Sequence, residues 1–309
     1  MKIQKRDSRS RTLKLIKNDY DLYLMIVPML VCLLLFTYRP LTSLVIAFKD
    51  YSPFKGIWAS PWCGFKHFKE FFSSHYAYRI IKNTLVLGGV QLFLGFPLPI
   101  IFALLIDDLK NGKFRKGIQT INLLPHFIST VIVCSMVLNF LSPTNGVINS
   151  MIVKLGGNPV YFMGKPQYFV PVYYIMTIWR QTGYNSIIYI SALTAIDGNL
   201  YEAATVDGAG KMSQLFHITL PELKTTIIIM FIIQLGSILN VSYESIILLY
   251  NPSIYETADV ISSFVYRVGM QQGRYDYSTA ADLMNSLLSF LLVVGANKIS
   301  KKVSDTSLW

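Results

Sequence analysis

The residues best able to do chemistry in this chain are polar side chains that stand inside long apolar stretches. Within residues 222–250 they recur at intervals of three and four, which on one continuous helix would place them on a shared face. Others lie one helical turn apart within residues 118–141 and 168–196. The set is His126, Thr130, Arg180, Tyr184, Asn185, Gln234, Ser237, Asn240, Tyr243 and Glu244.

Polar side chains of this kind have two possible roles in a membrane. They can join neighbouring helices through hydrogen bonds, or they can line a path for a polar solute. For any one of these residues the two roles are equally plausible, but the stripe in residues 222–250 favours a path. Arg180 is the most ambiguous of the set, because an ion pair with Glu244 or Asp282 would make it structural.

The composition is that of an integral membrane protein. Of 309 residues, 52% are hydrophobic and 15% are charged, against about 25% charged in soluble domains. Several apolar runs reach the ~20 residues that cross a bilayer. We therefore expect an all-α membrane protein with six spans, at residues 22–47, 80–106, 118–141, 168–196, 222–250 and 276–298.

The basic residues indicate how the chain is oriented. The net charge of +11 could suggest nucleic acid in a soluble protein, but here the clusters "KIQKRDSRSRTLKLIK" and "DDLKNGKFRKG" lie on the same side of the predicted spans. The positive-inside rule then places both termini in the cytoplasm. Residues 1–21 form a basic cytoplasmic segment, residues 22–309 form one transmembrane domain, and the loop 197–221 is cytoplasmic.

The scattered cysteines and histidines predict no metal site and no disulfide. Cys32, Cys63 and Cys134 have neither a metal-binding spacing nor a disulfide framework. His67 and His75 are eight residues apart without nearby acids, so we expect no metal there. The aromatic residues of 58–78 favour an interfacial belt with an amphipathic helix along the membrane over a sugar-stacking surface or a protein contact.

The loop 197–221 contains the unusually small and acidic stretch "YEAATVDGAG". We predict a short helix with Asn199 as its N-cap and Glu202 completing a capping box. Gly210 is expected to end this helix in a left-handed conformation, and Pro221 to open the next span.

One face of this short helix is predicted to be bare and apolar. Its members, at steps of four, are Leu200, Ala204, Gly208 and Met212. A helix lying on lipid would carry large apolar residues with lysine and arginine, whereas this one carries alanine, glycine and acids. The pattern therefore favours a docking point for another protein.

At this loop the chain resembles a known family. "EAATVDGAG" followed by "ITLP" is similar to the EAA loop of binding-protein-dependent ABC importer permeases. The matching positions are Glu202, Ala203, Ala204, Asp207, Gly208, Ala209, Ile218, Leu220 and Pro221. The stretches "IWRQTGYNSIIYISALTAIDGNLYEAA", "IAFKDYSPFKGIWASPWCGFKHFKEFF" and "LLPHFIS" resemble the oligosaccharide and polysaccharide branch, and the likeness runs from residue 20 to the end.

The resemblance implies a type I importer permease in a bacterial cell membrane. Its implied partners are a second permease subunit, two cytoplasmic ATPase subunits, an extracytoplasmic solute-binding protein and a carbohydrate. The EAA helix would seat in an ATPase cleft, with Glu202 facing a basic residue. The implied coupling residues are Glu202, Ala203, Ala204, Asp207, Gly208, Ala209 and Pro221. A sugar would find hydrogen-bonding groups and rings among Tyr184, Asn240, Tyr243, Gln234 and His126.

Two other functional classes can be weighed against a permease. A G-x-x-x-x-G-K-[ST] loop does not occur in the sequence, so ATP and Mg²⁺ would be used by partner ATPases and this chain would hold no cofactor. A membrane-embedded transferase of lipid or glycan metabolism would need convergent acids, a metal pair or an activated nucleophile, and the sequence predicts no catalytic residues of that kind. A passive channel would need no EAA helix.

Overall fold

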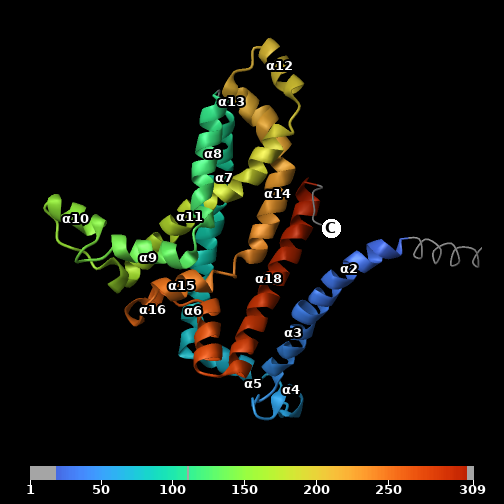
Figure 1. Cartoon of the computed structure of the whole chain (residues 1–309), viewed down its shortest axis with the longest axis vertical. Helices are drawn as coiled ribbons and strands as arrows, with labels where there is room; N and C mark the ends of the chain where they lie inside the picture. Colours follow the sequence, from blue (N-terminus) through green and yellow to red (C-terminus); the bar gives the residue numbers. More distant parts are fainter. Residues whose placement is uncertain (1–18, 110, 305–309) are drawn as a thin grey trace, which may run out of the picture.

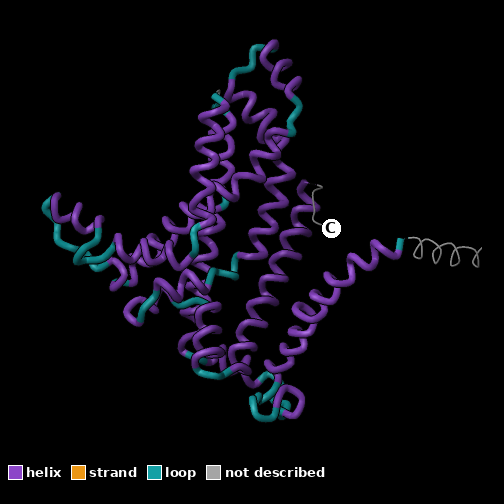
Figure 2. Tube along the Cα trace, in the orientation of Figure 1, coloured by secondary structure: helices purple, strands orange, loops and turns teal. Residues whose placement is uncertain are grey.

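The part of the chain that the computed structural model describes, residues 19–109 and 111–304, is helical throughout. Its one extended pairing is an isolated bridge between Lys49 and Trp62, and Figure 2 shows helices joined by short loops. The predicted all-α class is confirmed. Residues 1–18 of the predicted basic segment lie outside the described residues.

The helices form an elongated bundle with side branches. Those of the first half are α2 (Tyr20–Leu33), α3 (Arg39–Leu41), α4 (Gly56–Ala59), α5 (Lys66–Ser73), α6 (His75–Val90), α7 (Pro97–Asp107), α8 (Gly112–Phe127), α9 (Thr130–Phe140) and α10 (Val147–Lys154). Those of the second half are α11 (Pro166–Thr194), α12 (Gly198–Val206), α13 (Lys211–Gln214), α14 (Leu220–Ser237), α15 (Tyr243–Leu249), α16 (Tyr255–Ala258), α17 (Ile261–Val265) and α18 (Tyr275–Ser304).

Short 3-10 and π-helical segments join several of these helices. They cover Leu34–Tyr38, Thr42–Phe48, Gln91–Gly95, Phe162–Gly164, Leu215–Thr219, Pro252–Ile254 and Tyr266–Gln271. Through such joints α6 continues into α7, and α13 continues into α14. In Figure 1, α7, α8, α14 and α18 run along the long axis, with α12 at one end and α4 and α5 at the other.

Four helices within the described residues are long and apolar enough to cross a membrane. They are Tyr20–Phe48, His75–Asp107, Lys211–Ser237 and Tyr275–Lys302. The pair α8 and α9 reaches this length only together and is bent by 95°. The expected stretches at 22–47, 80–106 and 276–298 are confirmed as long apolar helices, and 168–196 is one continuous helix of 29 residues, α11.

The predicted continuous helix over residues 118–141 is wrong. α8 ends at Phe127 and α9 begins at Thr130, with Ile128 in an extended conformation between them. Pro125 lies in the last turn of α8, where its missing N–H and its ring weaken the helix. His126 and Thr130, expected one turn apart on one helix, therefore belong to different helices.

The predicted continuous helix over residues 222–250 is also wrong. α14 ends at Ser237 and α15 begins at Tyr243. Ser262 Oγ donates to the carbonyl of Val241 at 2.7 Å, and Asn285 Nδ2 lies 3.4 Å from the carbonyl of Leu239. A helix break at membrane depth is tolerated where neighbouring side chains satisfy the freed backbone groups in this way. The five polar residues of this stretch consequently do not share one helical face.

Two glycines allow neighbouring helical segments to pack with their backbones in contact. A Cβ built on Gly88 of α6 would lie 2.0 Å from the carbonyl oxygen of Ile238, at the break after α14. A Cβ on Gly183 of α11 would lie 2.1 Å from the carbonyl oxygen of Asn122 on α8. Small residues at such crossings let membrane helices pack backbone to backbone.

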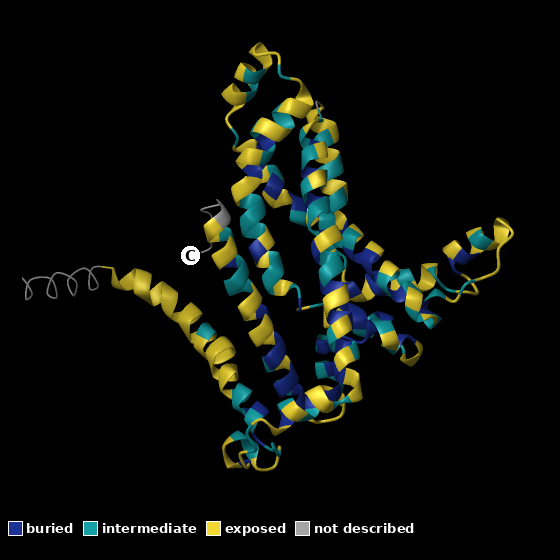
Figure 3. Ribbon diagram, turned by 180° about the vertical axis from the view of Figure 1, so that it is seen from behind, coloured by how far each residue is buried: buried dark blue, intermediate teal, exposed yellow. Residues whose placement is uncertain are grey.

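Three groups of buried side chains hold the bundle together. One joins α6, α9, α11 and α15, a second joins α5, α6, α17 and α18, and a third joins α7, α11 and α14. By contrast, none of the apolar window of Tyr20–Phe48 is buried. Figure 3 shows the helix that leads from the grey N-terminal trace as exposed along nearly its whole length. The apolar window of this helix is therefore left bare within the described residues, whereas its end, where Ile46 and Ala47 are buried, packs against α18.

The crossing at Gly88 gives a first prediction. Gly88→Ala is expected to destabilise the fold by about 1–3 kcal/mol, because the added methyl group overpacks the contact with Ile238. Gly89→Ala is the matched control: it lies on the same helix with nothing within 4 Å of its added Cβ, and alanine favours a helix by about 1 kcal/mol over glycine. The unfolding temperature of the purified chain in detergent should fall in Gly88→Ala and rise in Gly89→Ala. Equal shifts would show that the crossing is not tightly packed.

Candidate functional site

The loop of residues 197–221, which we call the coupling loop after its predicted role, begins with a helix capped two residues earlier than predicted. The carboxylate of Asp197 accepts a hydrogen bond from the backbone N–H of Asn199 at 3.0 Å, so Asp197 is the N-cap of α12. The prediction of Asn199 as N-cap is wrong, and with it the capping box to Glu202. Both aspartate and asparagine cap helices well, and here the aspartate comes first.

The helix also ends earlier than predicted, at Gly208. This residue has φ +79°, and the N–H of Ala209 donates to the carbonyl of Ala204 at 2.8 Å, the arrangement of a Schellman end. The expected left-handed position at Gly210 is wrong, because its φ is −71°. Met212 falls in the separate helix α13, so the predicted face of Leu200, Ala204, Gly208 and Met212 does not exist as one surface.

The exposed tip of the loop carries small residues, acids and one bare apolar side chain. Glu202, Ala203 and Asp207 are exposed, and Val206 is 88% exposed. Ala204 and Ala209 are half-buried beneath them. The acids of the tip have no ion-pair partner within the described residues, and α12 projects from the end of the bundle (Figure 1). The tip is free to meet another molecule.

Side chains tie the coupling loop to the body of the protein. The hydroxyl of Tyr201 lies 2.9 Å from that of Thr219, and Gln214 Nε2 donates to the carbonyl of Ala209 at 3.2 Å. Lys211 forms an ion pair with Asp108, at the end of α7. A displacement of α12 would therefore be passed to α7 and α14. Pro221 stands in the first turn of α14, as predicted.

A small polar cavity lies among α6, α11 and the break after α14. Its volume is about 190 Å³, and its polar lining is Gln91, Thr177, Gln181, Gln234, Ser237, Asn240 and Ser242. Three of the predicted path residues thus meet although the predicted helix is broken. Gln91 Oε1 is buried without a hydrogen-bond partner, which leaves an acceptor free for a solute. Gln91 was missed, although an amide within the apolar run 80–106 carries the same signal as the other intramembrane amides.

The aromatic residues of the predicted path form two stacks. The rings of His126 and Tyr184 are 3.8 Å apart and nearly parallel, at 4°. Tyr243 stacks at 5.7 Å on Tyr266, which was not predicted. Tyr184 and Tyr243 are 45% and 51% exposed. Each stack therefore contains one tyrosine that is accessible from outside the protein.

The remaining predicted path residues do not join one cluster. Thr130 is buried on α9, Arg180 and Asn185 are half-buried on α11, and Glu244 is exposed at the start of α15. Across residues 19–109 and 111–304, Arg180 forms no ion pair with Glu244 or Asp282. The pairing that would have made Arg180 purely structural is absent from this part of the chain.

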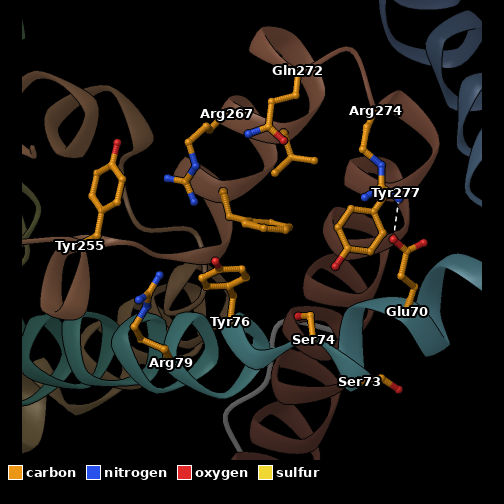
Figure 4. A pocket seen from close by; sticks show the side chains of 12 residues that line it. Glu70, Ser73, Ser74, Tyr76, Arg79, Tyr255, Arg267, Gln272, Arg274 and Tyr277 are labelled. Carbon is orange, nitrogen blue, oxygen red and sulfur yellow. Dashed lines mark hydrogen bonds and ion pairs between the residues drawn. The ribbon is translucent and has the colours of Figure 1, made fainter. Parts of the chain in front are cut away.

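A larger pocket of about 610 Å³, which we call the arginine pocket, lies at the opposite end of the bundle from α12 (Figures 1 and 4). Its lining residues are Glu70, Ser73, Ser74, Tyr76, Arg79, Tyr255, Phe264, Arg267, Val268, Gln272, Arg274 and Tyr277. They come from α5, α6 and the segment between α16 and α18. The sequence analysis missed this pocket, because its residues are far apart in the chain.

The charges of the arginine pocket are organised around a fully buried aspartate. Asp259 is 0% exposed and accepts bonds from Arg267 at 2.9 and 2.6 Å. Arg79 lies 3.8 Å from the same carboxylate, and Arg274 pairs with Glu70 at 2.6 Å. Burial alone would lower the pKa of Arg267, but the bonds with Asp259 outweigh it and raise that pKa. Arg267 therefore stays charged beside Asp259.

His67 has a different environment from the one predicted. His67 is 3% exposed, and its Nε2 lies 3.5 Å from carboxylate oxygens of both Asp50 and Asp276. The expectation that acids are absent near His67 is wrong, because the fold brings them from two other segments. Ligand atoms of Asp50, Cys63 and His67 lie within 4.8 Å of one another, so the three could hold a metal ion.

Lysine occupies part of this group. Lys66 Nζ donates to Asp50 at 2.7 Å, and this hydrogen bond holds the pKa of Asp50 below its ordinary value. The carboxylate is therefore already neutralised by an ammonium group. The backbone N–H of Tyr51 also reaches the carboxylate of Asp276 at 3.3 Å. We interpret the group as a clamp between the loop after α3 and the start of α18.

Comparisons with known proteins agree with this architecture. Residues 79–303 match the family described as "Binding-protein-dependent transport system inner membrane component". The chain is 41% identical to the polygalacturonan/rhamnogalacturonan transport system permease protein YteP of Bacillus subtilis (strain 168), over 99% of this chain and 96% of that protein.

Two solved structures have a similar fold over almost the whole chain. One is a bacterial ABC transporter involved in the import of the acidic polysaccharide alginate, with a TM-score of 0.89 and 44% identity over 95% of this chain and 99% of that chain. The other is a bacterial alginate ABC transporter in complex with an alginate pentasaccharide-bound periplasmic protein, with a TM-score of 0.89 and 44% identity over 96% and 100%.

The end of α12 gives a second prediction. Gly208→Ala is expected to open the turn, because a left-handed conformation costs an L-residue about 1–2 kcal/mol. Exchange of the Ala209 amide hydrogen should accelerate about 5- to 30-fold. Gly210→Ala is the matched control, with φ −71° and nothing within 4 Å of its added Cβ. If the Ala209 amide hydrogen exchanged at the same rate in both variants, glycine would not be needed at position 208 for this turn.

Proposed function

We propose the function of this chain from one premise: the chain belongs to the family of binding-protein-dependent transport system inner membrane components. It is a permease subunit of an ABC importer for sugars or oligosaccharides, and it is not an enzyme. It has the all-helical fold of type I importer permeases. The transferase alternative has no support among the relatives.

We propose that the cargo is an acidic oligosaccharide. One relative is described as a transporter of polygalacturonan and rhamnogalacturonan, and one structural neighbour as an importer of the acidic polysaccharide alginate. The single observation that carries the proposal is the 44% identity and TM-score of 0.89 to the alginate importer over 95% of the chain. All three of these polymers contain carboxylated sugars.

The arrangement in the membrane is the second part of the proposal. We infer six crossings in a bacterial cell membrane, with α11 and the bent α8–α9 pair as crossings besides the four apolar helices, and with both termini cytoplasmic. A second permease subunit would complete the path. The exposed α2 supports the need for such a partner.

Coupling to ATP is proposed to occur through α12. Two cytoplasmic ATPase subunits would use ATP and Mg²⁺, and the exposed tip of Glu202, Ala203 and Val206 would seat in one of them. Asp207 and Gly208 would shape the end of this contact, with Ala204 and Ala209 supporting it from below. The ties of Tyr201 to Thr219 and Lys211 to Asp108 support this role, since they connect the tip to α14 and α7.

The sugar is proposed to pass the polar cavity and the two aromatic stacks. Gln234, Ser237 and Asn240 would offer hydrogen bonds, and Tyr184 with His126 would offer a ring face. An extracytoplasmic solute-binding protein would deliver the sugar. The free acceptor of Gln91 and the exposure of Tyr184 support a path in preference to a purely structural role.

Uptake by the reconstituted complex tests this function. Liposomes that hold this chain, its second permease and its ATPases should import labelled trigalacturonate only with internal ATP and binding protein, whereas this chain alone should import none. If the liposomes imported the neutral sugar maltotriose but not trigalacturonate, the proposal of an acidic cargo would be contradicted.

Asn240→Ala and Tyr184→Ala should each slow uptake of trigalacturonate about fivefold, for about 1 kcal/mol per lost contact. Tyr78→Ala, at a 78% exposed ring outside the cavity, is the control.

The coupling loop gives a further prediction. Glu202→Lys should reduce recovery of the ATPase with the purified permease by about tenfold or more, because a like charge facing a basic partner costs several kcal/mol. Glu222→Lys makes the same change of charge at an exposed acid on α14 and should leave recovery unchanged. Equal recovery in both variants would remove Glu202 from the interface.

A further inference from the structure

The arginine pocket has one positive charge more than its own carboxylates neutralise. Three guanidinium groups, those of Arg79, Arg267 and Arg274, face two carboxylates, those of Asp259 and Glu70. Arg267 makes two close bonds to Asp259, and Arg274 makes one to Glu70. The uncompensated charge therefore falls on Arg79.

Arg79 is placed to bind a ligand. Its one ionic contact within the described residues is the 3.8 Å approach to Asp259, beyond hydrogen-bonding distance, and its Nε is buried without a partner. Its side chain is 31% exposed. Figure 4 shows the guanidinium groups of Arg79 and Arg267 entering the same space from opposite walls. A planar guanidinium with free N–H groups binds carboxylates in a two-bonded manner.

Aromatic rings stand next to this charge. Tyr76 precedes Arg79 by one turn on α6, its ring is 53% exposed, and the guanidinium of Arg79 lies 5.1 Å from the ring centre. Tyr255 forms another part of the wall. A ring face beside a guanidinium suits a sugar ring that carries a carboxylate, because the C–H face can stack while the acid pairs with arginine.

The size and position of the pocket fit such a ligand. Its volume of about 610 Å³ lies within the roughly 300–1,000 Å³ of small-molecule sites. The pocket is lined by α5 and the start of α6, which lie at the end of the bundle opposite α12 (Figure 1), and in the proposed orientation this end is the outer face. A sugar delivered from outside would meet this pocket before it met the polar cavity.

We propose that the arginine pocket binds a uronate unit of the incoming oligosaccharide, with Arg79 pairing with its carboxylate and Tyr76 stacking on its ring. This inference rests on the proposed function, since it names the part of the acidic cargo that the outer face recognises. An acidic loop of the binding protein could satisfy the same charge. The ring beside the arginine favours the sugar.

Direct binding tests the pocket. Trigalacturonate is titrated into the purified complete transporter in detergent, without binding protein, and compared with fully methyl-esterified trigalacturonate. Arg79→Gln should weaken binding of the acid about 10- to 100-fold, as expected for charge-assisted bonds, and leave the ester unchanged. Lys82→Gln, which removes a cation from an exposed position on the same helix, should change neither.

The second variant tests the ring. Tyr76→Ala should weaken the acid and the ester alike by several-fold, because stacking does not depend on the carboxylate. The unfolding temperature of each variant shows whether it is folded. If Arg79→Gln does not fold, Arg79→Lys keeps the charge without the planar fork and should bind the acid with intermediate affinity.

The outcomes separate the pocket from the transport function. Wild-type binding and uptake of trigalacturonate with no effect of Arg79→Gln would overturn the pocket and leave the function standing. Failure of the wild-type complex to import any acidic oligosaccharide would overturn the function by itself. If Arg79→Gln weakened binding of the sugar-free binding protein but left sugar binding unchanged, the pocket would be assigned to protein docking and the inference would be overturned.

Discussion

The structure depends on one constraint: backbone groups released from a helix inside a bilayer must find partners within the protein. α14 stops at Ser237, and the chain runs on to α15 with only turn-type hydrogen bonds, such as that from the N–H of Asn240 to the carbonyl of Ser237 at 2.9 Å. The side chains of Ser262 and Asn285 donate hydrogen bonds to backbone carbonyls within this break, and Gly88 lets α6 lie against it. Because the break is supported from three helices, it is a fixed part of the fold, and the polar cavity forms beside it.

The same need for internal partners shapes the end of the bundle opposite α12. The carboxylate of Asp259 is fully buried, and it is compensated by two bonds from Arg267 and one from Ser263. Asn83 on α6 donates to the carbonyls of Glu256 and Asp259, both at 2.9 Å. A buried charge with this many partners holds α6, α16 and α17 in one arrangement. The rings and free guanidinium of the arginine pocket are arranged on this fixed frame.

The coupling loop and the polar cavity are connected by α14. At one end, Thr219 just before this helix contacts Tyr201 of the coupling loop. At its other end lie the break and the polar cavity. In the proposed importer, a pull on α12 would move a helix whose far end borders the sugar path. A rigid helix between two sites is a simple means of joining ATP use to opening and closing.

The sequence by itself determined the class of the protein and the character of its coupling loop. Apolar runs of about 20 residues in a bilayer form helices, because a helix pairs its backbone groups internally. The small, acidic stretch at 201–210 predicts a docking tip, because a helix lying on lipid would carry large apolar residues with lysine and arginine. It also grouped Gln234, Ser237 and Asn240, which line one polar cavity, although the continuous helical face on which that grouping was based does not exist.

Only the tertiary structure decided where the helices break and which distant residues meet. The break after Ser237 depends on neighbours such as Gly88 and Asn285, which are remote in sequence. Asp197 and Asn199 are both good N-caps, and Gly208 and Gly210 can both adopt a left-handed conformation. Local propensity therefore could not decide which residue begins the helix and which ends it. The arginine pocket joins α6 to the segment before α18, and His67 meets Asp276 across the chain. The spacing of apolar and polar residues describes one segment at a time, so it cannot predict contacts between segments that are far apart in the chain.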